Sequence, residues 1–144
     1  MIRVTKLTDY GISLMTRLAT LDTEEQVTAV DLSQQLGLPL PTVRKILKIL
    51  TCEQLLVSTR GVTGGYSLGR IPEEITLMDM VAAFEGPIAM TECATDEPCD
   101  CKVTNCSLRE NWSLVNQLLQ NTLESYNLAQ MCGSLADIPV RRIK

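Results

Sequence analysis

The apolar spacing of residues 41–53, followed at once by a glycine-rich hairpin, constrains the fold more than any other feature. In residues 41–53, apolar side chains recur at i, i+3, i+4 and i+7, which predicts a helix with one buried face. These side chains are Val43, Ile46, Leu47 and Leu50. The following segments LLVST, RGVTGG and YSL predict a strand, a tight turn and a returning strand. A helix followed directly by such a hairpin is typical of a recognition helix and its wing.

Two further helices are predicted before this one. Residues 7–21 place five apolar side chains on one helical face: Leu7, Tyr10, Leu14, Leu18 and Leu21. A second helix begins after Thr28, which has the capping-box spacing to Asp31, and ends at Gly37. Two helices joined by a short turn form a helix-turn-helix. The expected fold class is mainly α with a small β-hairpin wing, a winged helix-turn-helix extended by a long C-terminal helix.

Charge is distributed unevenly along the chain. The formal net charge is −4, but residues 1–70 carry eight Lys/Arg and six Asp/Glu, a net of +2. Residues 71–144 carry five and eleven, a net of −6. The outer face of helix 41–53 carries Arg44, Lys45 and Lys48, and Arg60 lies in the hairpin turn. Taken alone, three cations on one helix would be interpreted as a solvated face. Together with the wing they predict binding to duplex DNA.

The second half predicts a helix from Thr76, with Asp79 at capping-box spacing, and a long helix that runs to about residue 125. Ser107 and Glu110 have the spacing of a capping box for that long helix. Its apolar positions form a broad stripe: Leu108, Trp112, Val115, Leu118, Leu119 and Leu123. A domain this small covers only part of such a stripe. We therefore expect a homodimer, whose two-fold symmetry would match a near-palindromic operator.

Within one compact domain, we expect three regions. Residues 1–86 form the winged helix-turn-helix, residues 87–106 a cysteine-rich loop, and residues 107–144 the dimerisation helix and tail. The sequence shows neither an export signal nor a long apolar run, which favours a cytoplasmic protein without a membrane segment. It also shows no nucleotide loop or acid–base pair. We therefore expect neither an enzyme nor a small-molecule substrate.

Four cysteines lie within 14 residues: Cys93, Cys99, Cys101 and Cys106. The chain contains no histidine, which excludes histidine-based catalytic triads and mixed Cys/His zinc sites. The spacing Cys-x5-Cys-x-Cys-x4-Cys contains no Cys-x2-Cys pair, the usual element of a structural zinc site. A thiol–disulphide switch is a second alternative. An iron–sulphur cluster is favoured, because it takes three or four thiolates from a loop and tolerates irregular spacing.

Several segments together resemble the Rrf family of winged-helix regulators: LTDYG, RGVTGGY, EGPIAMTEC and CSLRENW. The resemblance covers nearly the whole chain and is greatest to the branch described as regulators of SUF-system iron–sulphur assembly. It implies a homodimeric repressor that senses cluster status, oxidants or nitric oxide. Each subunit would hold one iron–sulphur cluster, with the 2Fe–2S type favoured and 4Fe–4S as the alternative.

The resemblance also implies a ligand set. Cys93, Cys99 and Cys106 match the three family thiolates, although the second gap is one residue longer than usual. Arg109 stands where some members have a ligating histidine, and it cannot ligate. In other members an acidic residue near the start of the first helix reaches the cluster from the partner subunit, and Asp9 stands at that position. We therefore rank Asp9 first and Cys101 second as the remaining ligand. For Asp9, a helix-start carboxylate favoured by the macrodipole is the alternative.

For DNA, the resemblance implies contacts from the third helix and the wing. The matching positions are Thr42, Arg44, Lys45, Lys48, Arg60, Gly61 and Thr63. Arg44 replaces a glutamate that reads bases in some members, and an arginine can bind guanine in the major groove. The two lysines are expected to contact phosphates. Arg60 is the candidate for insertion into the minor groove.

Overall fold

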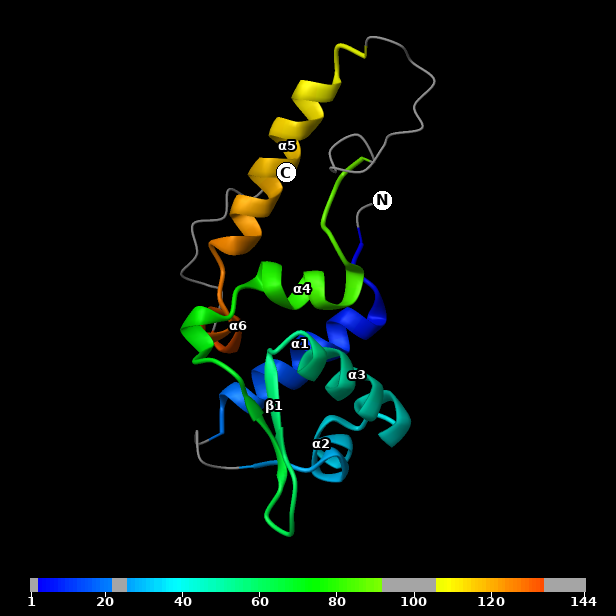
Figure 1. Cartoon of the computed structure of the whole chain (residues 1–144), viewed down its shortest axis with the longest axis vertical. Helices are drawn as coiled ribbons and strands as arrows, with labels where there is room; N and C mark the ends of the chain where they lie inside the picture. Colours follow the sequence, from blue (N-terminus) through cyan, green and yellow to red (C-terminus); the bar gives the residue numbers. More distant parts are fainter. Residues whose placement is uncertain (1–2, 22–25, 92–105, 134–144) are drawn as a thin grey trace.

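The computed structural model describes residues 3–21, 26–91 and 106–133. Its elements confirm the expected class, mainly α with one antiparallel hairpin (Figure 1). They are α1 (Lys6–Ala19), α2 (Ala29–Leu36), α3 (Leu40–Cys52), β1 (Leu56–Thr59), β2 (Gly65–Leu68), η1 (Pro72–Glu74), α4 (Leu77–Glu85), α5 (Arg109–Glu124) and α6 (Leu128–Cys132). No described helix is both long and apolar enough to span a membrane.

The predicted helix starts are set by local side-chain bonds. Thr28 accepts a hydrogen bond from the Asp31 amide, and the Asp31 carboxylate accepts one from the Thr28 amide, so the capping box is complete. Thr76 and Asp79 form the same reciprocal pair before α4. Each box satisfies backbone amides that a helix start leaves unpaired. The expected starts of α2 and α4 are therefore confirmed.

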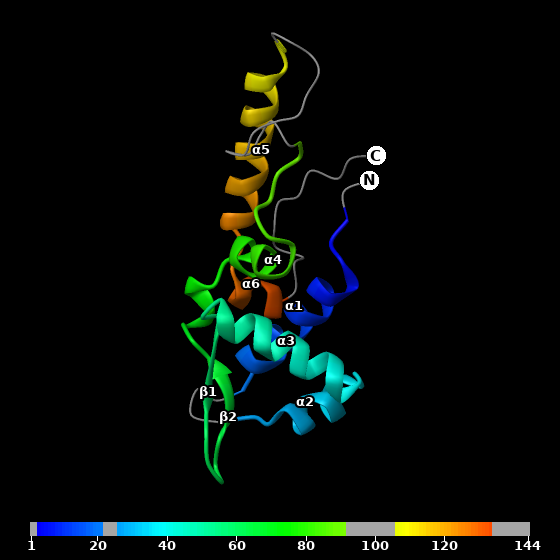
Figure 2. The same cartoon turned by 45° about the vertical axis from the view of Figure 1, so that its right-hand side comes forward.

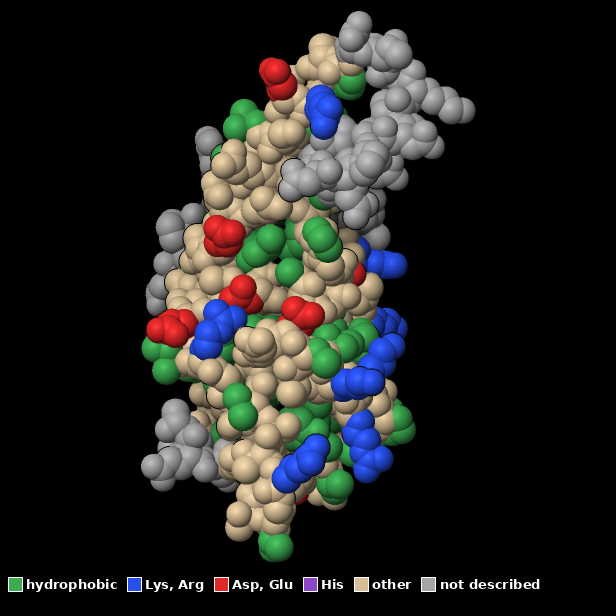
Figure 3. Space-filling model, in the orientation of Figure 1, with side chains coloured by type: hydrophobic (Ala, Val, Ile, Leu, Met, Phe, Trp, Pro, Cys, Tyr) green, Lys and Arg blue, Asp and Glu red, His purple; other side chains and the backbone are tan. Residues whose placement is uncertain are grey.

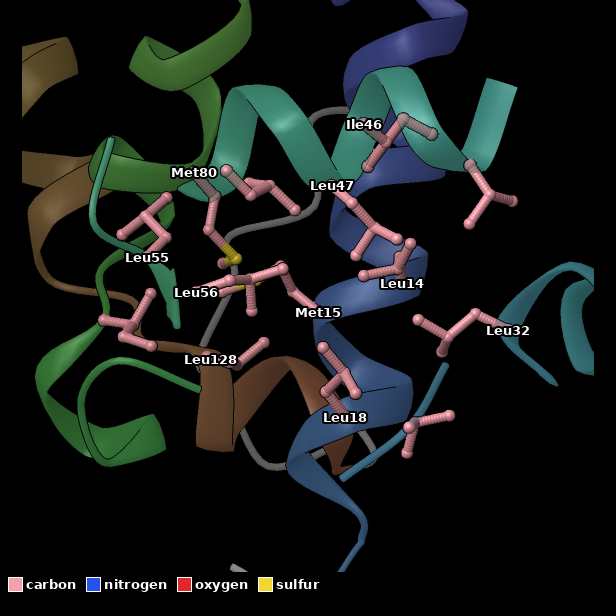
Figure 4. Packing of buried hydrophobic residues seen from close by; sticks show 14 residues of the cluster. Leu14, Met15, Leu18, Leu32, Ile46, Leu47, Leu55, Leu56, Met80 and Leu128 are labelled. Carbon is pink, nitrogen blue, oxygen red and sulfur yellow. The ribbon is translucent and has the colours of Figure 1, made fainter. Parts of the chain in front are cut away.

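The core lies where α1, α2 and α3 meet the hairpin and α4 (Figure 4). All four predicted α3 residues are completely buried. Leu14 and Leu18 face the core from α1, Leu32 from α2 and Met80 from α4. Each of these side chains contributes about 1.5–3 kcal/mol when it is fully removed from water. The core therefore fixes the orientation of α3 relative to α1.

The wing is anchored beside the start of α2. Strands β1 and β2 pair from Leu56 opposite Leu68 to Thr59 opposite Gly65. Val27, just before α2, exchanges two backbone hydrogen bonds with Tyr66, at 3.2 and 2.9 Å. The side-chain amide nitrogen of Gln26 also donates to the Thr59 hydroxyl at 2.9 Å. These bonds tie the far end of the hairpin to the helix-turn-helix.

The chain returns to the core after α5 through a helix that the sequence did not predict. The Leu77 amide donates to the Tyr126 carbonyl at 2.7 Å, and the Leu128 amide donates to the Ile75 carbonyl at 2.8 Å. α6 then packs on α1 and η1, with Leu128 completely buried. With only five residues, α6 is too short to show helical periodicity in the sequence.

Helix α5 projects away from this body (Figures 1 and 2). The prediction of its start was wrong in detail. The N-cap residue is Leu108, and its side chain makes no capping bond, so Ser107 and Glu110 do not form the expected box. Four large apolar side chains at the start and on the outer side of α5 remain between 42 % and 59 % exposed: Leu108, Leu114, Val115 and Leu118. The described parts of one subunit therefore leave much of this helix uncovered.

Candidate nucleic-acid interface

The outer face of α3 presents its cations to solvent. Arg44, Lys45 and Lys48 are exposed, while Thr42 is partly buried in the first turns of the helix. The opposite face of α3 is fixed in the core, so these side chains extend into solvent. Among the described residues, none of the three cations has a hydrogen-bond or ion-pair partner. They are free to bind an external anion.

The wing turn presents the second group of predicted contacts. Arg60, Gly61 and Thr63 are all exposed, and Gly61 has φ = 122°, a conformation that favours glycine. Next to them Val62 is fully exposed at the tip of the hairpin. Val62 was not among the predicted contacts, although its position between Gly61 and Gly64 was a signal for an apolar tip.

An open groove of about 450 Å³ separates the wing from the start of α2. It is lined by Thr28, Ser58, Arg60, Gly61 and Tyr66, among others. The lining is mainly polar and contains one cation. The groove thus adjoins the exposed wing residues. A polar lining with one cation suits the phosphate backbone of a nucleic acid.

Charges are separated over the surface. Most Lys and Arg side chains in view lie over α3 and the beginning of α1, whereas most Asp and Glu side chains lie over η1, α4 and α5 (Figure 3). A double helix carries dense negative charge, so it would be attracted to the α3 side and repelled from the α4–α5 side. The acidic net charge of the whole chain does not oppose DNA binding at this face.

The predicted metal ligands are only partly within the described residues. Cys93, Cys99 and Cys101 lie outside them. Cys106 is a free, half-buried thiol just before α5. Asp9 is exposed in the first turn of α1. In the part of the chain that the structure describes, no three Cys, Asp or Glu residues form a cluster that could hold a metal ion.

Two further cysteines lie within the described residues. Cys52 and Cys132 are exposed residues at the ends of α3 and α6. The Cys132 thiol donates a 3.6 Å hydrogen bond to the Thr16 carbonyl. Partial burial raises the pKa of this thiol, which disfavours the thiolate that binds metals. The structure gives neither cysteine a role beside Cys106.

A polar network connects α4 to the beginning of α1. Glu85, the last residue of α4, accepts hydrogen bonds from the Thr8 hydroxyl and, at 2.8 Å, from the Thr5 amide. The Thr8 hydroxyl donor, followed by the Thr5 donors, lowers the pKa of Glu85 because these bonds favour its carboxylate form. Thr8 is completely buried. Sequence reasoning missed this network because its partners lie 77 and 80 positions apart.

Comparison with protein families matches residues 4–134 to Rrf2, described as an iron-dependent transcriptional regulator. The chain belongs to the Rrf2 family. It is therefore a DNA-binding transcriptional regulator, and the resemblance inferred from its motifs is confirmed at this level. Of the relatives named below, IscR and CymR are named as transcriptional regulators and not as enzymes.

Two sequence relatives and one solved structure illustrate the range of the Rrf2 family. The chain is 27 % identical to protein rrf2 of Nitratidesulfovibrio vulgaris over 129 residues, covering 90 % of this chain and 86 % of that protein. It is 26 % identical to the regulator IscR of Aliivibrio salmonicida over 122 residues, covering 85 % and 72 %. The structure of CymR, the global cysteine regulator of Bacillus subtilis, matches with a TM-score of 0.73 and 25 % identity, covering 92 % and 97 %.

Proposed function

We propose that this Rrf2 protein is a homodimeric repressor that reports iron–sulphur status by changing its affinity for a near-palindromic operator. Genes of SUF-type cluster assembly are the proposed targets. The observation that carries the proposal is the combination of a free basic α3 face and wing with a thiol-rich segment in one chain. The DNA side rests on the wing and on the exposed Arg44, Lys45 and Lys48, which have no partner among the described residues.

Dimerisation is supported by α5. The outer side of this helix exposes Leu114, Val115 and Leu118 to solvent. Burial of this apolar surface against the same helix of a second subunit would remove it from water, and two-fold dimers are the commonest oligomers. Two recognition helices related by a two-fold axis would then contact two half-sites of one operator.

The donor chemistry fits an iron–sulphur cluster. Cys106 is a free thiol, Cys93 and Cys99 would complete three thiolates, and Asp9 or Cys101 would supply the fourth donor. Thiolates are the usual ligands of such clusters. When bound, the cluster would supply sensitivity to oxidants, nitric oxide and iron supply. The residues of the chain would hold it beside the first turn of α5, the proposed dimer helix.

A thiol sensor without a cluster is the second candidate, because the chain also resembles the global cysteine regulator CymR over 92 % of its length. In that case the cysteines would respond by forming a disulphide or binding zinc. The two candidates share the DNA-binding surface and differ only in the chemistry at Cys93, Cys99, Cys101 and Cys106.

One experiment separates these candidates. Protein purified without oxygen is measured by visible absorption and circular dichroism, and iron, sulphide and zinc are assayed in the same sample. The proposal predicts visible absorption with comparable iron and sulphide, and the band shape distinguishes 2Fe–2S from 4Fe–4S. A colourless protein that carries zinc, or that resists reconstitution with iron and sulphide, would overturn the iron–sulphur function in favour of the thiol sensor.

A further inference from the structure

The described part of the chain contains two buried polar side chains, Thr8 on α1 and Asn116 on α5. Both are hydrogen-bonded to the same short segment, residues 85–90, which we call the strap. Burial of a polar side chain lowers stability unless its hydrogen bonds are made, so such residues fix one particular arrangement. Because both buried side chains bind the strap, their hydrogen bonds fix its position against α1 and α5.

At its beginning the strap is held on α1. The Glu85 carboxylate accepts bonds from the Thr8 hydroxyl and the Thr5 amide, and the hydroxyls of Thr5 and Thr8 lie 2.9 Å apart. Immediately before it, the Phe84 ring lies against Gly11, where an added Cβ would overlap the ring. The end of α4 is therefore seated on the first two turns of α1.

At its end the strap is held on α5. The Met90 amide donates to the Asn116 side-chain oxygen at 3.2 Å, and the Gln120 side-chain amide donates to the Ile88 carbonyl at 3.0 Å. Asn116 and Gln120 lie one helical turn apart, so they bind successive parts of the strap from one face of α5. The strap thus connects the helix that supports α3 to the proposed dimer helix, and the chain leads from it toward Cys93.

We propose that the strap couples the cysteine segment to the DNA-binding surface, with Thr8 and Glu85 as its positioning residues. This inference rests on the proposed sensing function. A change in the cysteine segment would pull on residues 88–90 and, through Glu85, move the start of α1. Because α1 packs directly against α3, that movement would reach the recognition helix. Two distant sites are coupled when both bias the equilibrium of one shared element, and the strap is the element that we assign to this role.

The variants follow from the geometry. Glu85→Ala removes the acceptor at an exposed residue and leaves no cavity. Thr8→Val removes the buried hydroxyl at nearly constant volume, whereas Thr8→Ser keeps it. Thr16→Val is the matched control on the same helix, because among the described residues the Thr16 hydroxyl bonds only to the Ser13 carbonyl within α1.

The test measures duplex affinity in the full-length protein, once apo and once reconstituted with iron and sulphide. The duplex is one enriched by the wild-type protein from a random-sequence pool. We expect the wild-type affinities to differ by about 5- to 150-fold, the usual range for coupled sites. In Glu85→Ala and Thr8→Val the ratio should fall toward one, while Thr8→Ser and Thr16→Val should keep the wild-type ratio.

Hydrogen exchange of the apo proteins gives an independent readout. Glu85→Ala and Thr8→Val should exchange faster in the first turn of α1 than the wild type, Thr8→Ser and Thr16→Val. A wild-type ratio in Glu85→Ala, or unchanged exchange in both variants, would overturn the strap and leave the sensing function intact. A wild-type protein whose two forms bind DNA equally would overturn the sensing function, and the coupling with it.

Discussion

At the scale of single residues, the DNA-binding surface keeps the side chains that hold the fold separate from those that are free to bind. Val43, Ile46 and Leu47 point into the core, whereas Lys45 and Lys48 on the same helix face solvent. Arg70 illustrates the opposite case, since it is paired with Asp79 at 3.3 Å and donates to the Glu74 carbonyl. Substitution of an unpaired cation should therefore affect DNA binding differently from substitution of a paired one.

Arg60→Ala is expected to weaken operator binding by about 1–3 kcal/mol, because it removes the wing cation that we propose to insert into the minor groove. Duplex affinity measured at fixed salt checks this. Arg70→Ala changes the net charge equally but removes an exposed ion pair, so it should leave DNA affinity near that of the wild type. Equal affinity of Arg60→Ala and the wild type would exclude the wing from the interface.

Glu85 gives a prediction for pH. Its pKa in the folded protein lies below the ordinary value of 4.5, chiefly because the Thr8 hydroxyl donates to its carboxylate. The carboxylate therefore stabilises the fold above pH 4.5, and this contribution is lost as the pH falls through the lowered pKa. Thermal unfolding of Glu85→Gln should begin at a lower temperature than that of the wild type at neutral pH. The two curves should converge in acid, and parallel curves at all pH values would contradict the assignment.

At the scale of elements, the fit between helices depends on a few close approaches. α1 and α4 touch where Gly11 meets the Phe84 ring. α1 and α6 touch beside Leu128, and the wing is fixed by the bonds of Val27 and Gln26. The elements that carry the candidate interface are thus positioned by contacts outside it.

Gly11→Ala should destabilise the protein by about 1–3 kcal/mol, the usual effect of overpacking, because its Cβ would overlap the Phe84 ring. Unfolding in urea measures the loss. Gly133→Ala is the matched control, since among the described residues a Cβ there meets only the Gln130 carbonyl, at 3.6 Å. Replacing the ring in Gly11→Ala/Phe84→Leu should recover part of the lost stability, and a Gly11→Ala protein as stable as the wild type would contradict the packing.

The sequence predicted the elements whose determinants are local. The capping boxes at Thr28 and Thr76 and the buried face of α3 depend on residues within one or two turns, so pattern and structure agree. The sequence could not predict α6 or the bond between Thr8 and Glu85. α6 is short, and Thr8 is a small polar residue whose burial becomes evident only once α4 is placed beside α1. The exposed position of Arg44 followed from helical periodicity and that of Arg60 from the hairpin turn, but what they bind did not.

At the scale of the whole molecule, charge and apolar surface lie in different places. The basic side of the molecule is formed largely by α3, while α5 projects away from it and exposes its leucines (Figures 1 and 3). The two surfaces can therefore be occupied at the same time. A dimer formed through α5 would leave both α3 helices available, which is the geometry that a two-fold operator requires.

Leu118→Glu should convert the proposed dimer into monomers, because it places a charge on the outer face of α5, where Leu118 is 59 % exposed. Analytical ultracentrifugation would show the change, and far-ultraviolet circular dichroism would show that the subunit still folds. Gln117→Glu adds the same charge at the neighbouring exposed position and should remain dimeric. A dimeric Leu118→Glu protein would exclude this face of α5 as the interface.

The return of the chain to α1 through α6 has a consequence for how the protein is made. Leu128 is completely buried in a core whose other helices come mostly from the first half of the sequence. Because ribosomes synthesise the N-terminus first, the helix-turn-helix emerges long before the residue that completes its core. A partly synthesised chain therefore lacks one completely buried side chain of its core. By the time Leu128 is available, the strap, the cysteine segment and α5 have also been made, so every copy with a complete core already carries its cysteine segment.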